Sequence, residues 1–158
     1  MEYAKQQEEQ MAIQKITVVD HEAYTAWCFP TKRLLHHQFH RYSYGEEFQT
    51  NMAAALEAFI KYNCFKWLSD DRKFAGVLHQ DDWEWGTTNF TPQAVEAGWK
   101  FYAMVLSDRT IAAMRQNQLV EYFAAHGVKA ELFNKIEEAE AWIDSKGTLG
   151  IDLSSPED

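Results

Sequence analysis

Cysteine is scarce in this chain of 158 residues, which contains Cys28, Cys64 and no others. Two cysteines without a short spacing make neither a cysteine-rich zinc motif nor a disulfide framework, so we expect two reduced, largely buried thiols. Basic residues are also few, because 15 Lys and Arg stand against 24 Asp and Glu, giving a formal net charge of −9. A surface with that charge repels nucleic-acid backbones and anionic membranes, so we expect neither as a partner.

Long apolar runs and signatures of catalysis are missing as well. No stretch approaches the ~20 apolar residues that a membrane-spanning helix needs, and the polar segment 1–10 does not resemble a signal peptide, so we expect a cytoplasmic protein. The sequence contains no Gly-x-Ser-x-Gly elbow, phosphate-binding loop or dinucleotide fingerprint, and no histidine motif accompanies the cysteines. We therefore expect a non-enzymatic protein without catalytic residues, bound metal or cofactor.

Aromatic and apolar side chains are abundant: 46% of the residues are hydrophobic and 15% are aromatic, including 6 Trp. This content supplies a packed core for one domain without help from disulfides or metals. The segment 1–12 is rich in Glu and Gln, and the segment 148–158 ends in Ser-Ser-Pro-Glu-Asp. We expect a single domain at 13–147, with a flexible lead before it and a loose tail after it.

The spacing of the hydrophobic residues predicts an α/β fold. β-branched residues after position 13 begin a strand-like stretch, and a tight turn at Pro30 joins 24–29 to 34–41 as an antiparallel hairpin. The order of the later elements predicts a mixed sheet that begins with this hairpin and continues through right-handed parallel crossovers, with helices packed on it. The later elements are a helix at 44–63, a strand at 65–69, helices at 80–88 and 91–98, a strand at 101–106, a helix at 108–126, a strand at 128–133 and a helix at 136–147.

Two helix starts have a recognisable chemistry. Ser43 and Glu46 have the spacing of a capping box, which places the start of a helix near Tyr44. Asp81 and Asp82 fall in the first turn of the helix at 80–88, where the helix dipole favours acidic side chains. Both patterns therefore predict where a helix begins.

A set of short motifs is spread over most of the domain. They are Lys-Trp-Leu-Ser-Asp-Asp-Arg at 66–72, Trp83, Ala-Gly-Trp-Lys at 97–100, Tyr-Ala-Met-Val at 102–105, Phe133 and Glu-Ala-Glu-Ala-Trp at 138–142. Together they resemble a bacterial group of small STAS-like (SpoIIAA-like) proteins of STAS/SEC14 type, whose function is unassigned. The resemblance implies a mixed sheet begun by a hairpin, and a role in signalling or protein contact rather than catalysis.

The wider STAS-type fold includes anti-sigma-factor antagonists in which a serine at a strand-to-helix junction is phosphorylated. The corresponding junction here contains His79, Asp81 and Asp82 and has no hydroxyl group. The resemblance therefore implies a domain without the phosphoserine switch. A permanently acidic junction that mimics phosphoserine is one interpretation of these residues, and plain helix capping is the one that we favour.

Acidic residues cluster on either side of an apolar segment, at Asp70 and Asp71 and again at Asp81, Asp82 and Glu84. Converging carboxylates would bind a divalent cation or raise one another's pKa. A solvated patch neutralised locally by basic neighbours is the simpler interpretation. Within it, we expect Arg72 to hold Asp70 bidentately and to shape the loop after the strand.

Histidines are the other candidate ligands. On a strand, His36 and His40 would lie about 13 Å apart, too far for one zinc ion, so we interpret them and His37 as sheet-surface residues. His79 beside Asp81 is a better acid–base candidate, but no nucleophile accompanies it.

The tryptophans suggest a small-molecule site, because aromatic walls with a few polar groups are typical of ligand pockets. Trp67 and Trp142 are expected in the core. Trp83 and Trp85 are two residues apart on a short helix and are not expected to face inward together, so one of them would be exposed for a partner or ligand.

Three functions follow from these patterns. We favour a protein-interaction or signalling domain, with a homodimer as the expected assembly, and this hypothesis predicts no deep pocket. A domain for a small apolar ligand or lipid predicts a concave apolar cavity near Trp83, Trp85 and Trp99. A carboxylate-dependent metal enzyme predicts carboxylates within metal-bridging distance. The candidate interaction or ligand residues are Asp70, Asp71, Arg72, His79, Asp81, Asp82, Trp83, Trp85 and Trp99.

Overall fold

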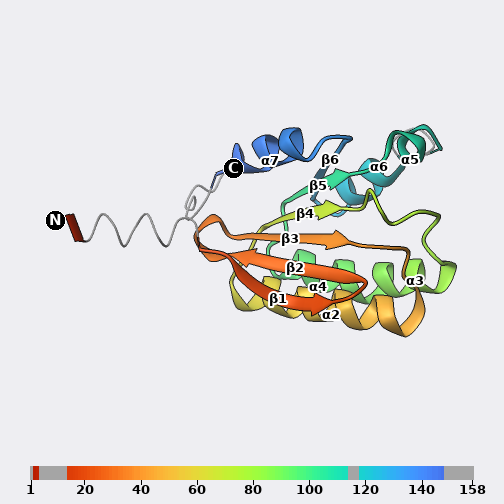
Figure 1. The fold of residues 1–158 in the computed structure, drawn as a ribbon, viewed down its shortest axis with the longest axis horizontal. Helices are drawn as coiled ribbons and strands as arrows, with labels where there is room; N and C mark the ends of the chain where they lie inside the picture. Colours follow the sequence, from red (N-terminus) through yellow and green to blue (C-terminus); the bar gives the residue numbers. More distant parts are fainter. Residues whose placement is uncertain (1, 4–13, 114–117, 148–158) are drawn as a thin grey trace.

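The computed structural model describes residues 2–3, 14–113 and 118–147 (Figure 1). The flexible lead expected at 1–12, apart from residues 2 and 3, and the loose tail expected at 148–158 lie outside the described residues. In the described ranges, no helix combines the length and the apolar character that crossing a membrane requires.

Within the described residues, six strands form one sheet, and their order in space is their order along the chain. The first three pair antiparallel, and each later strand pairs parallel with the one before it. The predicted α/β class, with an antiparallel beginning and parallel crossovers, is therefore confirmed. The strands are Ile16–His21 (β1), Tyr24–Phe29 (β2), Leu34–Phe39 (β3), Lys66–Asp70 (β4), Phe101–Val105 (β5) and Lys129–Phe133 (β6).

The predicted turn between β2 and β3 is a single helical turn, Pro30–Lys32 (η1), which begins with Pro30. Proline suits this position because its fixed φ is already helical. The turn ends at Arg33, which adopts a left-handed conformation with φ 55°. Its side chain donates a hydrogen bond to the carbonyl oxygen of Asn63, at 2.8 Å, just before β4 begins.

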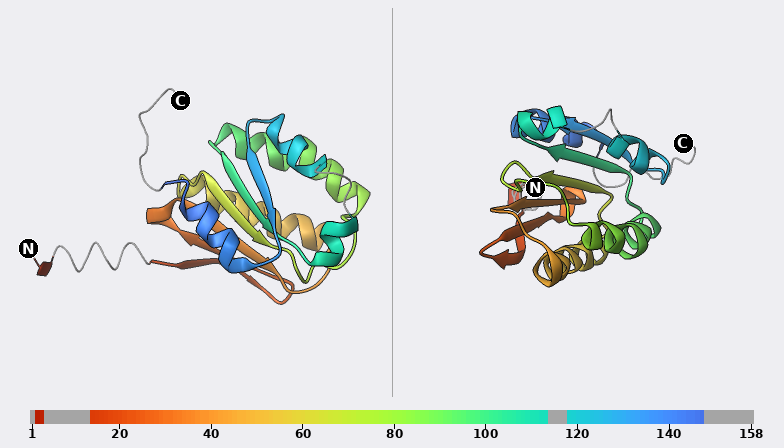
Figure 2. Two further views of the ribbon diagram at one scale, coloured as in Figure 1. Left: turned by 90° about the horizontal axis from the view of Figure 1, so that it is seen from above. Right: turned by 90° about the vertical axis from the view of Figure 1, so that its right-hand side faces the viewer.

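Helices cover both faces of the sheet (Figure 2). Buried side chains of three helices, Gly45–Lys61 (α2), Thr91–Glu96 (α4) and Gln118–Ala124 (α6), share one large core cluster on the first face. Ile136–Asp144 (α7) packs on β4, β5 and β6 and buries a smaller cluster on the second face. The remaining helices are Gln80–Trp85 (α3), which continues through the π-helical turn Gly86–Phe90 (η2) into α4, and Asp108–Ala113 (α5).

The large cluster is rich in aromatic rings, and Trp67 lies at its centre, 1% exposed, as predicted. Trp142 is half-buried and packs against the smaller cluster beside Phe101 and Phe133. Both thiols are buried, as predicted, and the Sγ atoms of Cys28 and Cys64 lie 3.7 Å apart.

The capping box predicted at Ser43 and Glu46 is wrong. Helix α2 is preceded by Tyr44, which makes no side-chain capping bond, and Ser43 donates instead to the carboxylate of Glu47. The first amide of the helix, at Gly45, donates to Asp82 Oδ2 at 2.9 Å. A residue distant in sequence therefore caps this helix, which a local pattern cannot predict.

The helix predicted at 108–126 is described as α5 and α6, on either side of residues 114–117, which lie outside the described residues. The other predicted helices and strands are present, with ends that differ by a few residues.

Candidate functional site

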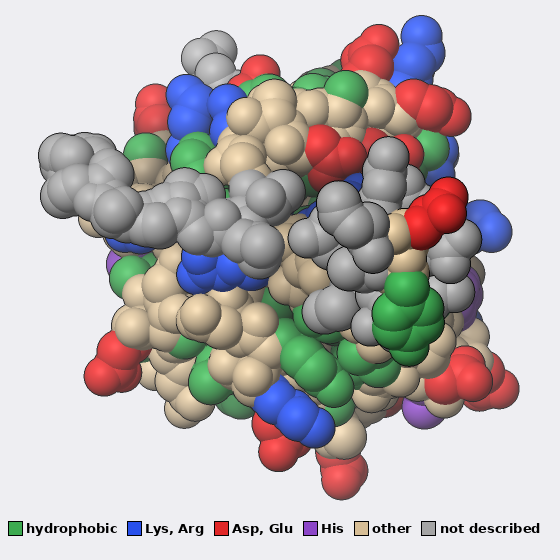
Figure 3. All heavy atoms as spheres, turned by 90° about the vertical axis from the view of Figure 1, so that its left-hand side faces the viewer, with side chains coloured by type: hydrophobic (Ala, Val, Ile, Leu, Met, Phe, Trp, Pro, Cys, Tyr) green, Lys and Arg blue, Asp and Glu red, His purple; other side chains and the backbone are tan. Residues whose placement is uncertain are grey.

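A cavity of about 1220 Å³ lies where β3, β4 and β5 end. Its walls come from α2, from the loop 71–79, from α3, and from α5 and α6. Pockets for drug-sized ligands commonly measure about 300–1,000 Å³, so this cavity has room for a molecule of that size or larger. Figure 3 views the opposite end of the sheet, where β3, β4 and β5 begin and where basic side chains lie among acidic and hydrophobic ones.

Aromatic side chains form opposite walls of the cavity. Trp83 packs on Tyr122 of α6, with ring centroids 5.1 Å apart, and Trp85 packs edge-on against Phe48 of α2 at 6.4 Å. Both tryptophans are half-buried and both line the cavity. The expectation that they do not face inward together is wrong, because α3 lies between two walls and each indole reaches a different one.

Trp99 also lines the cavity and is 2% exposed. Its indole nitrogen donates to the carbonyl oxygen of Phe101 at 3.0 Å. Its ring contacts those of Tyr102 and Phe123, with centroids 5.0 Å and 5.4 Å away. Because its only donor is already used, Trp99 offers a ligand an apolar surface.

A chain of hydrogen bonds lies at the floor of the cavity, and three of its members, His37, Asp71 and Tyr102, line the cavity. The Trp67 indole donates to His37 Nδ1 at 3.0 Å, and His37 Nε2 lies 3.2 Å from Asp71 Oδ1. Ser69 Oγ lies 3.1 Å from Asp71 Oδ2 and also 3.1 Å from the Tyr102 hydroxyl. We call these five residues the polar floor. His37 is 2% exposed, so its interpretation as a sheet-surface residue is wrong.

The tautomer of His37 follows from its partners. An indole N–H can only donate, so His37 Nδ1 is the acceptor and its proton is on Nε2, which donates to Asp71. A carboxylate only accepts, so the hydroxyl hydrogen of Ser69 also goes to Asp71, and Tyr102 donates to Ser69. Both oxygens of Asp71 therefore receive a hydrogen bond from the protein.

Two phenols, the buried Tyr24 and the partly buried Tyr102, are close enough to this carboxylate to feel its charge. Burial, and then the charge of Asp71, raise the pKa of Tyr102 and of Tyr24 well above the ordinary value. Both hydroxyl groups are therefore neutral at physiological pH. In the described ranges the Tyr24 hydroxyl is buried without a hydrogen-bond partner, and so is that of Tyr122 on the cavity wall.

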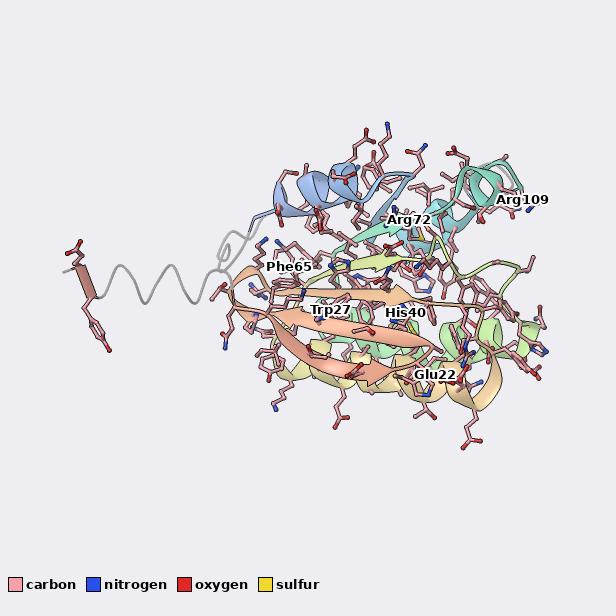
Figure 4. The ribbon with its side chains drawn as sticks, viewed as in Figure 1. Glu22, Trp27, His40, Phe65, Arg72 and Arg109 are labelled. Carbon is pink, nitrogen blue, oxygen red and sulfur yellow. The ribbon has the colours of Figure 1, made fainter. Side chains whose placement is uncertain are left out.

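The pair predicted between Asp70 and Arg72 is present. Arg72 Nε donates to Asp70 Oδ1 at 2.8 Å and its terminal nitrogen to Oδ2 at 2.7 Å. Burial raises the pKa of Asp70, but the hydrogen bonds and charge of Arg72 outweigh it and hold the pKa below the usual value. The pair shapes the start of the loop 71–79, beside the cavity (Figure 4).

The other predicted site residues do not converge on one point. Asp82 is fully buried and accepts from Gly45 and from Gln49 Nε2, whereas Asp81 is exposed. His79 precedes α3, and its Nδ1 accepts from the Asp81 amide at 3.2 Å. Among the residues that the structure describes, no three histidine, cysteine or acidic side chains are placed to hold a metal ion.

Ser69 and Tyr102 are parts of the site that the sequence analysis missed. Residues alternate across a strand, so Ser69 shares the face of Trp67, and Tyr102 is the partner of Trp67 on the neighbouring strand. That alternation is the signal that could have placed both residues beside the buried tryptophan.

In comparisons with known proteins, no family model, no curated protein and no solved structure matches the chain. The likeness to small STAS-like proteins therefore depends on the sequence motifs alone and stays a prediction.

Proposed function

We propose that this chain is a non-enzymatic binding domain for a small, largely apolar ligand, which occupies the cavity at the ends of β3, β4 and β5. The observation that carries the proposal is the cavity itself, with aromatic walls and a small polar floor. The ligand-binding hypothesis expected such a cavity near Trp83, Trp85 and Trp99, and all three line it. The protein-interaction hypothesis expected no deep pocket, so the cavity favours ligand binding.

The arrangement of the polar floor supports binding rather than catalysis. Ser69, His37 and Asp71 are the residue types of a hydrolytic triad, but in a triad the histidine lies between the serine and the aspartate. Here Asp71 lies between them, and both nitrogens of His37 are occupied, one by Trp67 and one by Asp71. His37 therefore has no free nitrogen with which to accept the proton of Ser69 or of a substrate.

Native mass spectrometry of the protein purified from its own source tests this proposal. We expect a mass above the 18.4 kDa of the polypeptide by the mass of a small molecule, which is lost on denaturation. Leu119→Trp fills the cavity from α6 and should abolish the retained mass, while circular dichroism checks that the fold persists. Glu121→Trp adds the same side chain to an exposed position of α6 outside the cavity and should leave the mass unchanged.

Two other outcomes would contradict the proposal. Wild-type protein of bare polypeptide mass that also fails to bind apolar aromatic probes would show that the cavity has no ligand. Equal retention by both tryptophan variants would place the small molecule elsewhere on the protein.

A second candidate function is protein contact through the sheet face that carries α7. Trp27 and Phe29 of β2 and His36 of β3 lie on this face and are half-buried, and the rings of Trp27 and His36 are 5.3 Å apart. Aromatic side chains are enriched at protein interfaces, and a second copy of the chain is the occupant that we propose. Light scattering on the intact protein tests this: a dimer that Trp27→Ser converts to monomer supports it, and a wild-type monomer overturns it. The cytoplasmic location also stays a prediction.

A further inference from the structure

We propose that the polar end of the ligand is a neutral or cationic hydrogen-bond donor, a hydroxyl or an amine, which binds Asp71 on the polar floor. This inference depends on the proposed function, since it names the chemical class of the ligand for the same cavity. It follows from the hydrogen-bond donors and acceptors of the site, because some of them are already paired within the protein and others are not.

Donors of the polar floor are already used within the protein. The Trp67 indole donates to His37, His37 and Ser69 donate to Asp71, and the Tyr102 hydroxyl binds Ser69. A ligand carboxylate or phosphate that reached the floor would therefore lack donors there. Arg72 lines the cavity beside the floor, where it uses Nε and one terminal nitrogen on Asp70 and keeps the N–H groups that Asp70 does not use.

Acceptor capacity remains at Asp71. An ionised carboxylate has about four acceptor positions, and the protein fills one on each oxygen of Asp71, from His37 and from Ser69. The side chain of Asp71 is 19% exposed and lines the cavity. A carboxylate beside apolar walls attracts a donor strongly and repels an anion, because screening by water is weak there.

The wall provides a second polar group. The hydroxyl of Tyr122 is buried and has no hydrogen-bond partner in the described part of the chain. Leaving such a group unpaired is unfavourable, so a ligand atom that pairs with it is favoured. A phenol both donates and accepts, so a ligand hydroxyl can meet either need and a protonated amine can donate to the phenol oxygen. The site therefore fits an amphipathic molecule with an aromatic or polycyclic body and a donor group.

The rival arrangement has an anionic group held at the cavity margin by Arg109 or by the N–H groups of Arg72 that Asp70 does not use. Both arginines line the cavity, and Arg109 is exposed on α5 (Figure 4). An acidic ligand would then bind in the opposite orientation, away from Asp71. The experiment has to separate these two arrangements.

Four pyrene compounds with the same aromatic body distinguish the arrangements: methylpyrene, pyrenemethanol, pyrenemethylamine and pyrenecarboxylate. Energy transfer from the tryptophans of the cavity to pyrene reports binding. We expect the wild-type protein to bind the alcohol and the amine about tenfold more tightly than the carboxylate, the ratio that one charge-assisted hydrogen bond supplies. Asp71→Asn should reduce that ratio to about twofold or less, while Asp81→Asn, at an exposed position outside the cavity, should leave it unchanged.

Each other outcome has a defined meaning. Tightest binding of the carboxylate, lost in Arg109→Gln or in Arg72→Gln, or equal binding of all four compounds would overturn this inference and leave the proposed function standing. Failure of all four compounds to bind the wild-type protein would overturn the proposed function. If Asp71→Asn does not fold, the inference is tested by the order of the affinities of the four compounds for the wild-type protein and by the change of that order in Tyr122→Phe.

Discussion

Asp82 shows how far the role of one residue can differ from that of its neighbour. Its carboxylate is fully buried and accepts from the Gly45 amide and the Gln49 side chain, each at 2.9 Å. It therefore caps α2 while belonging to α3, and it joins two neighbouring helices that both line the cavity. Asp81, one position earlier, is exposed.

We expect Asp82→Ala to lower the free energy of unfolding by about 1–3 kcal/mol, because it removes a helix cap and leaves the Gly45 amide without a partner. Urea denaturation of the variant and the wild type measures the difference. Asp81→Ala is the matched control and should change stability by about 0.5 kcal/mol or less, as exposed positions usually do. Equal losses in the two variants would contradict the capping role.

Asp70 gives a second prediction at this scale. Its carboxylate is 5% exposed and is held bidentately, so Asp70→Ala should cost about 1–2 kcal/mol of stability. Arg72→Ala should also lower stability, because the carboxylate of Asp70 would stay buried without its partner. Thermal melting of both variants tests the pair, and an unchanged midpoint for Asp70→Ala would show that it does not stabilise the loop.

At the scale of elements, the loop 71–79 depends on backbone geometry as well as on side chains. Gly76 has φ 119°, a value that residues with a side chain rarely adopt, and a Cβ there would lie 3.4 Å from the ring of Tyr42. The Tyr42 hydroxyl donates to the carbonyl oxygen of Val77 at 2.8 Å, so this ring also holds the loop. The loop forms one wall of the cavity, and its shape therefore affects the site.

Gly76→Ala should destabilise the protein by about 1–3 kcal/mol, because alanine is strained in this conformation. Gly86 is the matched control: it is helical, with φ −63°, and a Cβ there meets nothing within 4 Å. Gly86→Ala should be neutral or stabilising by up to about 1 kcal/mol, from helix propensity alone. Chemical denaturation compares the two, and a similar loss in both variants would contradict the assignment of strain to Gly76.

Most elements could be predicted from the sequence because their signals are local. The hydrophobic spacing that indicates α2 and the apolar run that indicates β5 depend on neighbours within a few residues. The cap of α2 could not be predicted in this way, since Asp82 is 37 residues from Gly45. Trp83 and Trp85 pack against different walls of the cavity because α3 lies between its neighbours. The sequence of α3 alone does not contain that information.

The polar floor could not be predicted from the sequence, for the same reason. Asp71 stands out in the sequence as part of an acidic cluster, but its partners His37 and Ser69 come from β3 and β4, and Tyr102, which bonds to Ser69, comes from β5. Only the register of three parallel strands brings them together. Local charge predicted a solvated patch, whereas the structure places this carboxylate on the floor of an apolar cavity.

Mild acid should lower the free energy of unfolding of the whole protein through the titration of His36. Burial, and then the electrostatic effect of the neighbouring His37, lower the pKa of His36 to about 4, although Asp70 acts in the opposite direction and Lys15 adds a smaller lowering effect. The unfolded chain binds a proton at this histidine below about pH 6.5, while the folded chain does not until about pH 4. The contribution of neutral His36 to the free energy of unfolding is therefore complete above pH 6.5 and is lost as the pH falls toward 4.

Comparison with His36→Gln isolates this contribution, because the carboxylates are common to both proteins. Between pH 6.5 and 4, the free energy of unfolding of the wild type should fall by up to about 3 kcal/mol more than that of the variant. Urea titrations at several pH values measure both slopes. Parallel pH profiles for the two proteins would show that His36 titrates normally in the folded state.

Strand order in space repeats strand order along the chain, and this bears on how the protein is made. During synthesis, each parallel strand that leaves the ribosome meets a neighbour that has already been made, so pairing does not have to wait for a later strand. The face under α7 is different, because Leu34, Leu68 and Val105 are buried there only once the last helix, ending at Asp144, has docked. The nascent chain therefore carries an open apolar surface until α7 has been made and has docked, and that interval is when it is most exposed to aggregation and to chaperones.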